Sequence, residues 1–234
     1  ASQRIRKGVP GATGVHHRSG GAIYMAGGAK VDGRMLGFSF HSYLTSLKGV
    51  LGRLPLERVT RICDVLHEAY LNNRSVFIFG NGGSAALASH MACDLGKGTH
   101  CPSPGAGNMT TVKRLKVLSL TDNLPMITAW ANDASFEDIF AEQMANFIEP
   151  GDVAFAISGS GNSPNVLKGL SAAKQRGAVT VGITGCQGGK MIALLDCGVV
   201  VPADNMQQIE DVHLIIAHLI FLDLRQRISQ GGQA

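Results

Sequence analysis

Short apolar segments alternate with helical segments along most of the chain, and this alternation constrains the fold more than any other feature. The expected strands are 75–79, 115–120, 152–157, 178–183 and 198–201, and the helices that follow them are about 84–95, 136–147, 163–176, 188–195 and 206–228. Strict alternation of wholly apolar strands with helices is typical of a parallel sheet that helices cover on both faces. We therefore predict an α/β fold whose ligands bind at the carboxyl ends of the strands.

Two further helices are expected before the first strand. Residues 38–73 carry apolar side chains at intervals of three and four, and Pro55 separates the two helical stretches. This predicts a helical hairpin, and its exposed leucines indicate that it packs between subunits. We predict one domain over residues 37–230 that includes this hairpin, and a flexible, glycine-rich, basic extension over residues 1–36.

Charge and cysteine content exclude several classes of protein. The formal net charge is +4, and the excess of basic residues is scattered through the glycine-rich start of the chain, so we expect no nucleic-acid partner. The five cysteines show no C-x-x-C spacing, which argues against a disulfide framework or a cysteine zinc site. No apolar run is long enough to cross a membrane, and no signal peptide opens the chain. We expect a cytoplasmic protein that does not bind membranes.

The segment GNGGSAA, residues 80–86, follows the first strand directly and predicts an anion site. Its backbone N–H groups lie at the start of a helix, where the helix dipole favours negative charge. Gly80, Gly82 and Ala85 also fit the dinucleotide fingerprint G-x-G-x-x-G/A. That fingerprint needs an acidic residue about 20 positions later, but His100 stands there. A single phosphate therefore fits the loop better than a dinucleotide.

The segment after the third strand repeats this form and adds hydroxyl groups. Ser158, Ser160 and Ser163 follow strand 152–157 within a glycine-rich turn. Each hydroxyl can donate a hydrogen bond to a phosphoryl oxygen, and Ser163 stands at a helix start. Asp122 follows the second strand and Thr184 follows the fourth, so four strand ends carry polar groups.

The combined motifs give a family resemblance. GNGGSAA, SGSGNSPN, TGCQGGKM and QQIEDVH occur in this order, and residues 40–226 resemble a sugar isomerase (SIS) domain of the phosphoheptose isomerase branch. The resemblance implies a three-layer, flavodoxin-like fold with a five-stranded parallel sheet, a homotetramer, and active sites between subunits. It implies that Ser84, Ser158, Ser160 and Ser163 hold a substrate phosphate, with Asn81 and Thr184 close by. The further candidate substrate contacts are Gly82, Gly83, Asp122, Asn132, Asp133 and Glu210.

Ionisable residues on two of the expected helices supply candidates for catalysis. His90 and Asp94 are four apart, which places them on one face of helix 84–95. The resemblance implies that His90, Asp94, Glu210 and His218 bind a divalent metal, typically zinc. Two of these differ from the family, which has Glu at position 94 and Gln at position 210. Asp211 is aligned with His218 better than Glu210 is, and we interpret His213 as a packing or capping residue.

These observations predict an enzyme that isomerises a sugar phosphate. The expected reaction converts sedoheptulose 7-phosphate to D-glycero-D-manno-heptose 7-phosphate through an enediol, with Asp94 and His218 as the acid–base pair. One alternative is a non-catalytic SIS protein that binds a phosphosugar or associates with a replication initiator. Another is a sugar-phosphate sensor or kinase-linked regulator. The ionisable residues at 90, 94, 210 and 218 favour the enzyme, because a binding protein does not need them.

Overall fold

The structure of the protein, a computed structural model, describes residues 30–31, 34–35, 38–100 and 113–231. The chain divides into two compact units, Ala1–Gly37 and Phe38–Ala234. In the first unit, β1 (Lys30–Val31) and β2 (Arg34–Met35) pair as short antiparallel strands. The rest of the extension predicted for residues 1–36 lies outside the described residues.

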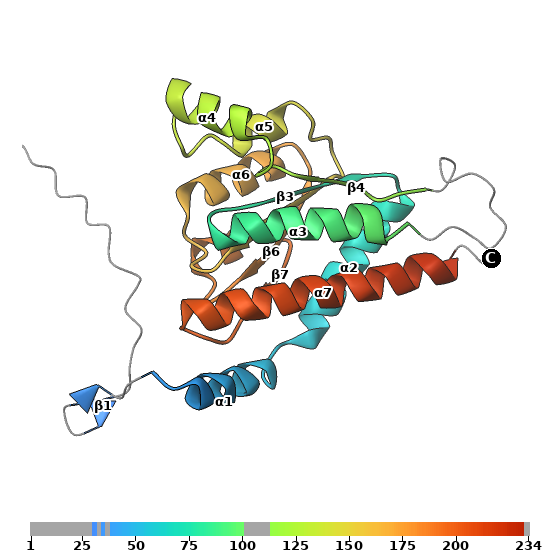
Figure 1. Ribbon diagram of the computed structural model, residues 1–234. Coiled ribbons are helices and arrows are strands. Elements are labelled where there is room, and N and C mark those ends of the chain that lie inside the picture. Colours follow the sequence, from blue (N-terminus) through green and yellow to red (C-terminus); the bar gives the residue numbers. More distant parts are fainter. Residues whose placement is uncertain (1–29, 32–33, 36–37, 101–112, 232–234) are drawn as a thin grey trace, which may run out of the picture. The chain divides into compact units, whose positions relative to one another are not determined.

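A five-stranded parallel sheet forms the centre of the second unit (Figure 1). All four strand pairs are parallel, and the strand order is β4-β3-β5-β6-β7. The strands are β3 (Ser75–Gly80), β4 (Lys116–Ser119), β5 (Val153–Ser158), β6 (Val179–Thr184) and β7 (Cys197–Val200). The order has the flavodoxin-like form, and it confirms the predicted α/β fold.

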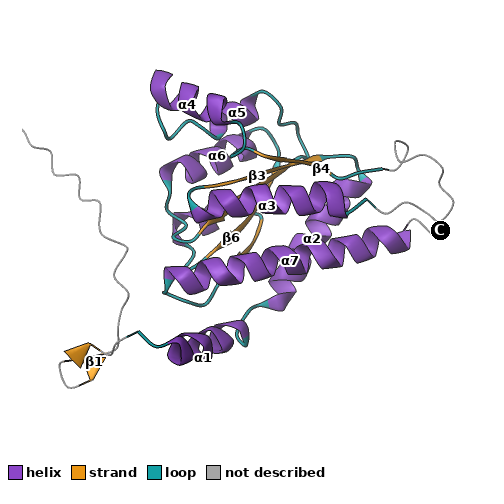
Figure 2. Ribbon diagram, in the orientation of Figure 1, coloured by secondary structure: helices purple, strands orange, loops and turns teal. Residues whose placement is uncertain are grey.

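Helices cover both faces of this sheet, so the unit has three layers (Figure 2). One face packs against α2 (Leu56–Leu71), α3 (Gly83–Gly98) and α7 (Met206–Gly231), and the other against α5 (Ala141–Ala145), α6 (Pro164–Gln175) and η2 (Gly189–Leu194). Alternate side chains of each strand serve the two cores, as the strand period of two requires: Val76 and Ile78 join the first, and Phe77 and Phe79 the second. Burial on both faces explains why the central strands β3 and β5 are almost wholly apolar, whereas the edge strand β4 is largely exposed and begins with Lys116.

The helix predicted over residues 136–147 is wrong. The structure has a longer helix before it, α4 (Leu124–Asp133), and only the five-residue α5 within the predicted range. The side chain of Asn123 caps α4 by accepting a hydrogen bond from the Met126 backbone N–H at 3.2 Å, and Pro125 stands in the first turn. No residue of α4 is fully buried, and the helix meets the core only through partly buried side chains such as Ile127 and Trp130.

The two helices expected before the sheet form, and they are divided at Pro55 as predicted. They are α1 (Phe40–Leu51) and α2. They do not pack along each other as a hairpin would, because α2 packs against α7 and β7 instead. Side chains of α1 bond to the first turns of α7: the Tyr43 hydroxyl donates to Asp211 at 2.5 Å, and Ser46 donates to Gln208 at 3.3 Å.

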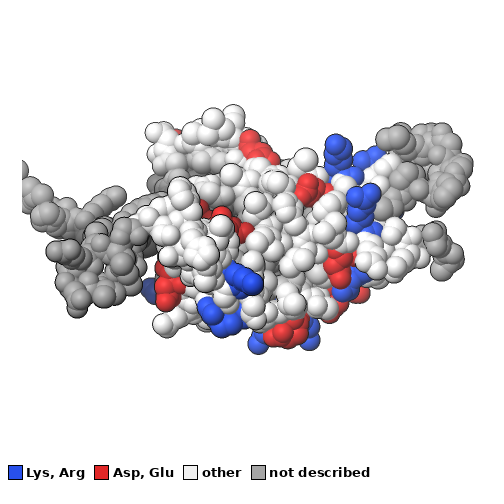
Figure 3. Space-filling view, turned by 60° about the horizontal axis from the view of Figure 1, so that its bottom comes forward, with Lys and Arg blue, Asp and Glu red and all other residues white. Residues whose placement is uncertain are grey.

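Charged side chains of both signs are interspersed on the face shown in Figure 3, without a continuous basic or acidic stripe among the described residues. None of the described helices combines the length and the apolar character that a membrane span needs.

Candidate active site

The carboxyl ends of β3 and β5 lie side by side at the point where the strand order reverses. The chain leaves β3 toward β4 on one side and returns to β5 on the other side. Open parallel sheets bind ligands at this switch point. Gly80, the last residue of β3, is paired with Ile157 of β5, so the two loops predicted to hold an anion leave adjacent strands.

Glycine is required in the first of these loops. A Cβ atom at Gly80 would lie 2.6 Å from the Ile157 carbonyl oxygen, which the adjacent strand does not allow. Gly82 has a φ of +55°, a conformation that residues with a side chain rarely adopt. Because α3 begins at the next residue, its N-terminus opens at the switch point.

The second loop presents hydroxyl groups in a fixed backbone turn. Ser158 Oγ accepts a hydrogen bond from the Gly161 backbone N–H at 3.2 Å, and Ser160 Oγ accepts one from the Asn162 backbone N–H at 3.2 Å. Both hydroxyl hydrogens stay available as donors to a ligand. Ser163 is the N-cap residue of α6, but its side chain makes no capping hydrogen bond. This arrangement suits a phosphate at the start of α6.

A pair of asparagines ties the two loops together. Asn81 and Asn165 exchange two amide hydrogen bonds, each 2.8 Å long, and Asn165 is buried. The Asn165 oxygen also accepts the backbone N–H of Val166 at 2.9 Å. The predicted substrate contact Asn81 therefore holds α6 against the end of β3.

His90, Asp94 and His218 form one cluster between α3 and α7, as the sequence predicts. His90 Nε2 lies 3.2 Å from Asp94 Oδ2 and 3.3 Å from His218 Nε2, and His218 Nε2 lies 4.0 Å from the same carboxylate oxygen. All three side chains are partly exposed, so a ligand can reach them. The cluster brings two imidazoles and one carboxylate to a single point.

The geometry of this cluster fits a divalent zinc ion. Ligand atoms from the three residues lie within 4.8 Å of one another. Tetrahedral zinc with bonds of about 2.0–2.1 Å separates its ligand atoms by roughly 3.3 Å, close to two of the three distances observed here. Nitrogen and carboxylate ligands also suit zinc, and three protein ligands leave one position open, as in catalytic zinc sites.

Glu210 does not join the cluster, although the resemblance implies that it binds the same metal. Its carboxylate lies against the start of α3, where a Cβ atom at Gly83 would be 3.1 Å from Glu210 Oε1. Glu210 and His90 both line a pocket of about 280 Å³ between α3 and α7, together with Gly83, Ser84, Ala86, Leu87, Asp211, His213 and Leu214. The pocket connects the first anion loop with the His90 side of the cluster.

Thr184 and Asp122 stand at the ends of β6 and β4. Within the described part of the chain the buried Thr184 hydroxyl has no hydrogen-bond partner. A Cβ atom at Gly161 would lie 2.9 Å from it, so Thr184 is adjacent to the serine loop. Asp122 accepts a hydrogen bond from Ser89 of α3.

The predicted substrate contacts Asn132 and Asp133 do not lie beside the other candidate site residues. They lie at the end of α4, and Asn132 donates to the Asp133 carboxylate at 2.9 Å. The core to which α4 contributes is on the face of the sheet opposite α7.

Residues 42–185, more than half of the chain, match the SIS domain family, and the chain belongs to that family of α/β proteins. A phosphoheptose isomerase from Paramagnetospirillum magneticum is 36% identical over 180 residues, which cover 77% of this chain and 88% of the relative. The chain therefore lies in the phosphoheptose isomerase branch.

Solved structures agree with this placement. A phosphoheptose isomerase from Francisella tularensis has a TM-score of 0.68 and 25% identity, covering 80% of this chain and 96% of its own. A phosphoheptose isomerase from Neisseria gonorrhoeae also has a TM-score of 0.68, with 27% identity, covering 78% of this chain and 92% of its own. The resemblance stated from the sequence motifs is confirmed.

Sequence reasoning missed two residues that build the site, Asn165 and Ser89. Asn165 lies in the SGSGNSPN motif, but its role depends on the adjacency of β3 and β5. Ser89 bonds to both Asp122 and Thr121, which links α3 to the end of β4. A serine one residue before His90 carries no signal of this role.

Proposed function

We propose that this protein is an aldose–ketose isomerase that converts sedoheptulose 7-phosphate to D-glycero-D-manno-heptose 7-phosphate. The observation that carries the proposal is the cluster of His90, Asp94 and His218, which lies beside the pocket leading from the switch point. The cluster can transfer protons, and it lies at the other end of the pocket from Gly83 and Ser84, where a phosphate fits. Membership of the phosphoheptose isomerase branch supports the same activity.

The substrate phosphate is held at the two glycine-rich loops. Ser158, Ser160 and Ser163 supply hydroxyl donors, and the starts of α3 and α6 supply backbone N–H groups. The asparagine pair keeps these loops at a fixed separation. A phosphate anchored there positions the other end of the sugar for reaction, because the rest of the chain can extend through the pocket.

The reaction moves two protons without net gain or loss of atoms. A base takes a proton from C1 of the ketose, the C–H electron pair forms the C1=C2 bond, and the C2 carbonyl oxygen takes up a proton to give the enediol. The O1 hydroxyl then loses its proton as C1=O forms, and C2 takes up a proton. Asp94 and His218 act as the acid–base pair in these transfers.

We further propose that His90, Asp94 and His218 hold a divalent metal ion, with zinc as the ion that fits best. A zinc ion bound there would act as a Lewis acid on the oxygens of the sugar. The three side chains would then hold that ion at the reacting end of the sugar.

One assay tests the proposed reaction. Purified protein is incubated, with and without added zinc, with a panel of ketose phosphates of five to seven carbons, and the aldose products are separated by chromatography. We expect sedoheptulose 7-phosphate to be converted fastest. Binding of this sugar without formation of an aldose under either condition would show a non-catalytic binding protein instead.

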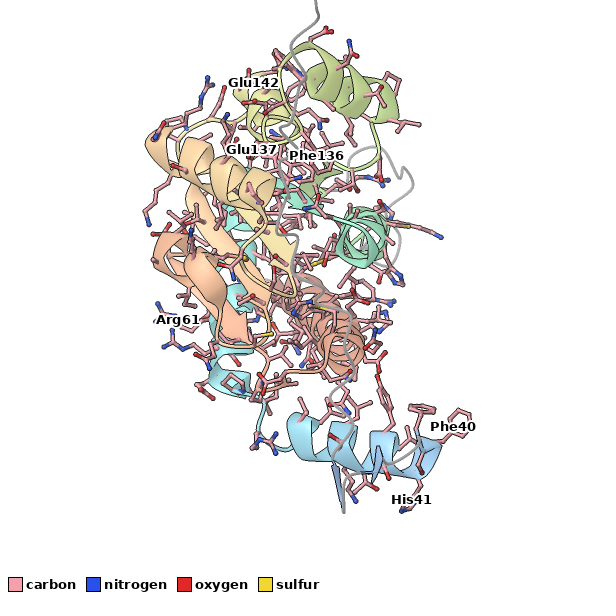
Figure 4. The ribbon with its side chains drawn as sticks, turned by 90° about the vertical axis from the view of Figure 1, so that its left-hand side faces the viewer. Phe40, His41, Arg61, Phe136, Glu137 and Glu142 are labelled. Atoms are coloured by element: carbon pink, nitrogen blue, oxygen red, sulfur yellow. The ribbon has the colours of Figure 1, made fainter. Side chains whose placement is uncertain are left out.

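Two expectations accompany this proposal. We propose a homotetramer with active sites between subunits, supported by exposed apolar side chains at the start of α1. Phe38, which precedes the helix, is 75% exposed, and Phe40, its first residue, is 80% exposed and projects outward in Figure 4. We also propose a cytoplasmic location, as the cysteine pattern indicates.

A further inference from the structure

His213 is buried in the pocket wall with both ring nitrogens unpaired. It lies on α7 one turn after Glu210, its side chain is 1% exposed, and it lines the pocket shared by Ser84 and His90. Neither Nδ1 nor Nε2 has a hydrogen-bond partner among the described residues. Its burial agrees with the packing role expected from the sequence, but packing alone does not require a histidine at this position.

An apolar side chain would fill the same position more favourably in the free protein. A neutral imidazole carries one N–H donor and one acceptor, and leaving such groups buried and unpaired destabilises a fold. Burial lowers the pKa of His213 to about 4, and the Thr184 backbone, which lies near the ring without reaching hydrogen-bond geometry, opposes this only in part. The ring is therefore neutral near pH 7.

The position of His213 along the pocket indicates what could pair with it. Gly83 and Ser84 line one end of the pocket, near the anion loop, and His90 lines it toward the proton-transfer cluster. A sugar that extends between these ends passes the imidazole. Its hydroxyl groups suit a neutral imidazole, because each hydroxyl can donate to one ring nitrogen or accept from the other.

We propose that His213 contacts the substrate directly, as a neutral hydrogen-bond partner for an oxygen of the sugar chain between the phosphate and the reacting carbons. This inference rests on the proposed function, since it names a further contact in the same pocket. It makes His213 a determinant of sugar binding and gives it no part in holding the phosphate.

The variant His213→Phe tests this proposal, because two of its effects have opposite signs. The free protein becomes more heat-stable, since an unpaired buried polar group is removed, while sedoheptulose 7-phosphate binds about 5- to 100-fold more weakly by calorimetry. Binding of inorganic phosphate stays unchanged. His213→Gln, which keeps a donor and an acceptor, recovers part of the sugar affinity.

Ile216→Val is the matched control, because Ile216 is fully buried on the same helix but belongs to the core. It lowers the melting temperature and leaves both affinities unchanged. Unchanged sugar affinity in soluble His213→Phe, in a preparation whose wild type binds and isomerises the sugar, overturns the proposal for His213 alone. Wild-type protein that neither binds nor converts the sugar overturns the proposed function itself. His213→Leu replaces His213→Phe if the larger ring prevents folding.

Discussion

Asp94 contacts both histidines of the cluster, and no other carboxylate of the described residues joins them. Asp94→Asn preserves the shape of the side chain but removes its charge and its capacity to take a proton. We expect turnover to fall about a hundredfold or more, because general acid–base steps contribute about 10²–10⁴. Phosphosugar binding should persist, because the serine loops are untouched.

Steady-state kinetics and calorimetry on the same Asp94→Asn preparation separate these two effects. Asp204→Asn serves as the control, because Asp204 is exposed and lies outside the cluster. If zinc binds at the cluster, the metal content of Asp94→Asn should also fall. Full turnover in Asp94→Asn would remove this residue from the catalytic pair.

Ser160 offers a residue-scale test of the phosphate site. Its oxygen accepts the Asn162 backbone N–H, which leaves the hydroxyl hydrogen for the ligand. Ser160→Ala should weaken phosphosugar binding by about 1–3 kcal/mol, as expected when one donor to a charged group is lost. Binding of the unphosphorylated sugar should not change, and neither affinity should change in Ser171→Ala, further along α6. An equal loss for both sugars in Ser160→Ala would contradict the phosphate assignment.

At the scale of elements, the N-terminus of α3 already has a negative group beside it. The Glu210 carboxylate lies against Gly83, at the positive end of the helix dipole, where a substrate phosphate is also expected. Glu210→Gln should lower stability by about 0.3–1 kcal/mol at low ionic strength, an effect that added salt reduces. The same change should strengthen phosphosugar binding, because one negative charge near the phosphate is lost.

Glu57→Gln is the control for this helix effect. Glu57 lies in the first turn of α2, so its removal should also lower stability without changing phosphosugar affinity. Thermal unfolding and titration calorimetry at two salt concentrations measure both quantities. Weaker phosphosugar binding in Glu210→Gln would show instead that Glu210 binds the substrate or its metal directly.

Strands with a continuous apolar sequence could be predicted, because burial in the core determines that pattern. Contacts between segments that are distant in the sequence could not be predicted. The central strands β3 and β5 form apolar runs in the sequence because both of their faces are buried. The helix α4 is an exception: Asn123 and Pro125 mark its start, but it contributes no fully buried side chain, and the sequence did not predict it. In the site, motif resemblance located His90, Asp94 and His218, but only the adjacency of β3 and β5 reveals the pair Asn81 and Asn165.

At the scale of the whole molecule, the exposed face of α1 argues for assembly. Leu44 is 63% exposed on α1, beside the aromatic side chains of the same helix, and such apolar patches usually contact a partner. The Tyr43 hydroxyl of α1 donates a hydrogen bond to Asp211, which lines the active-site pocket. A change in the subunit contacts of α1 can therefore alter the position of Asp211 in that pocket. We expect a tetramer in which α1 packs against a second copy.

Leu44→Glu should therefore dissociate the assembly and reduce turnover together, because a charge placed in an apolar interface is left desolvated and unpaired. The matched control is Leu124→Glu, since Leu124 is 66% exposed but lies on α4, away from the proposed interface. Light scattering coupled to size-exclusion chromatography gives the mass of each variant, and kinetics on the same fractions gives its activity. A wild-type monomer at micromolar concentration, or equal effects of the two substitutions, would contradict assembly through α1. Dissociation of Leu44→Glu with full activity would place each active site within a single subunit.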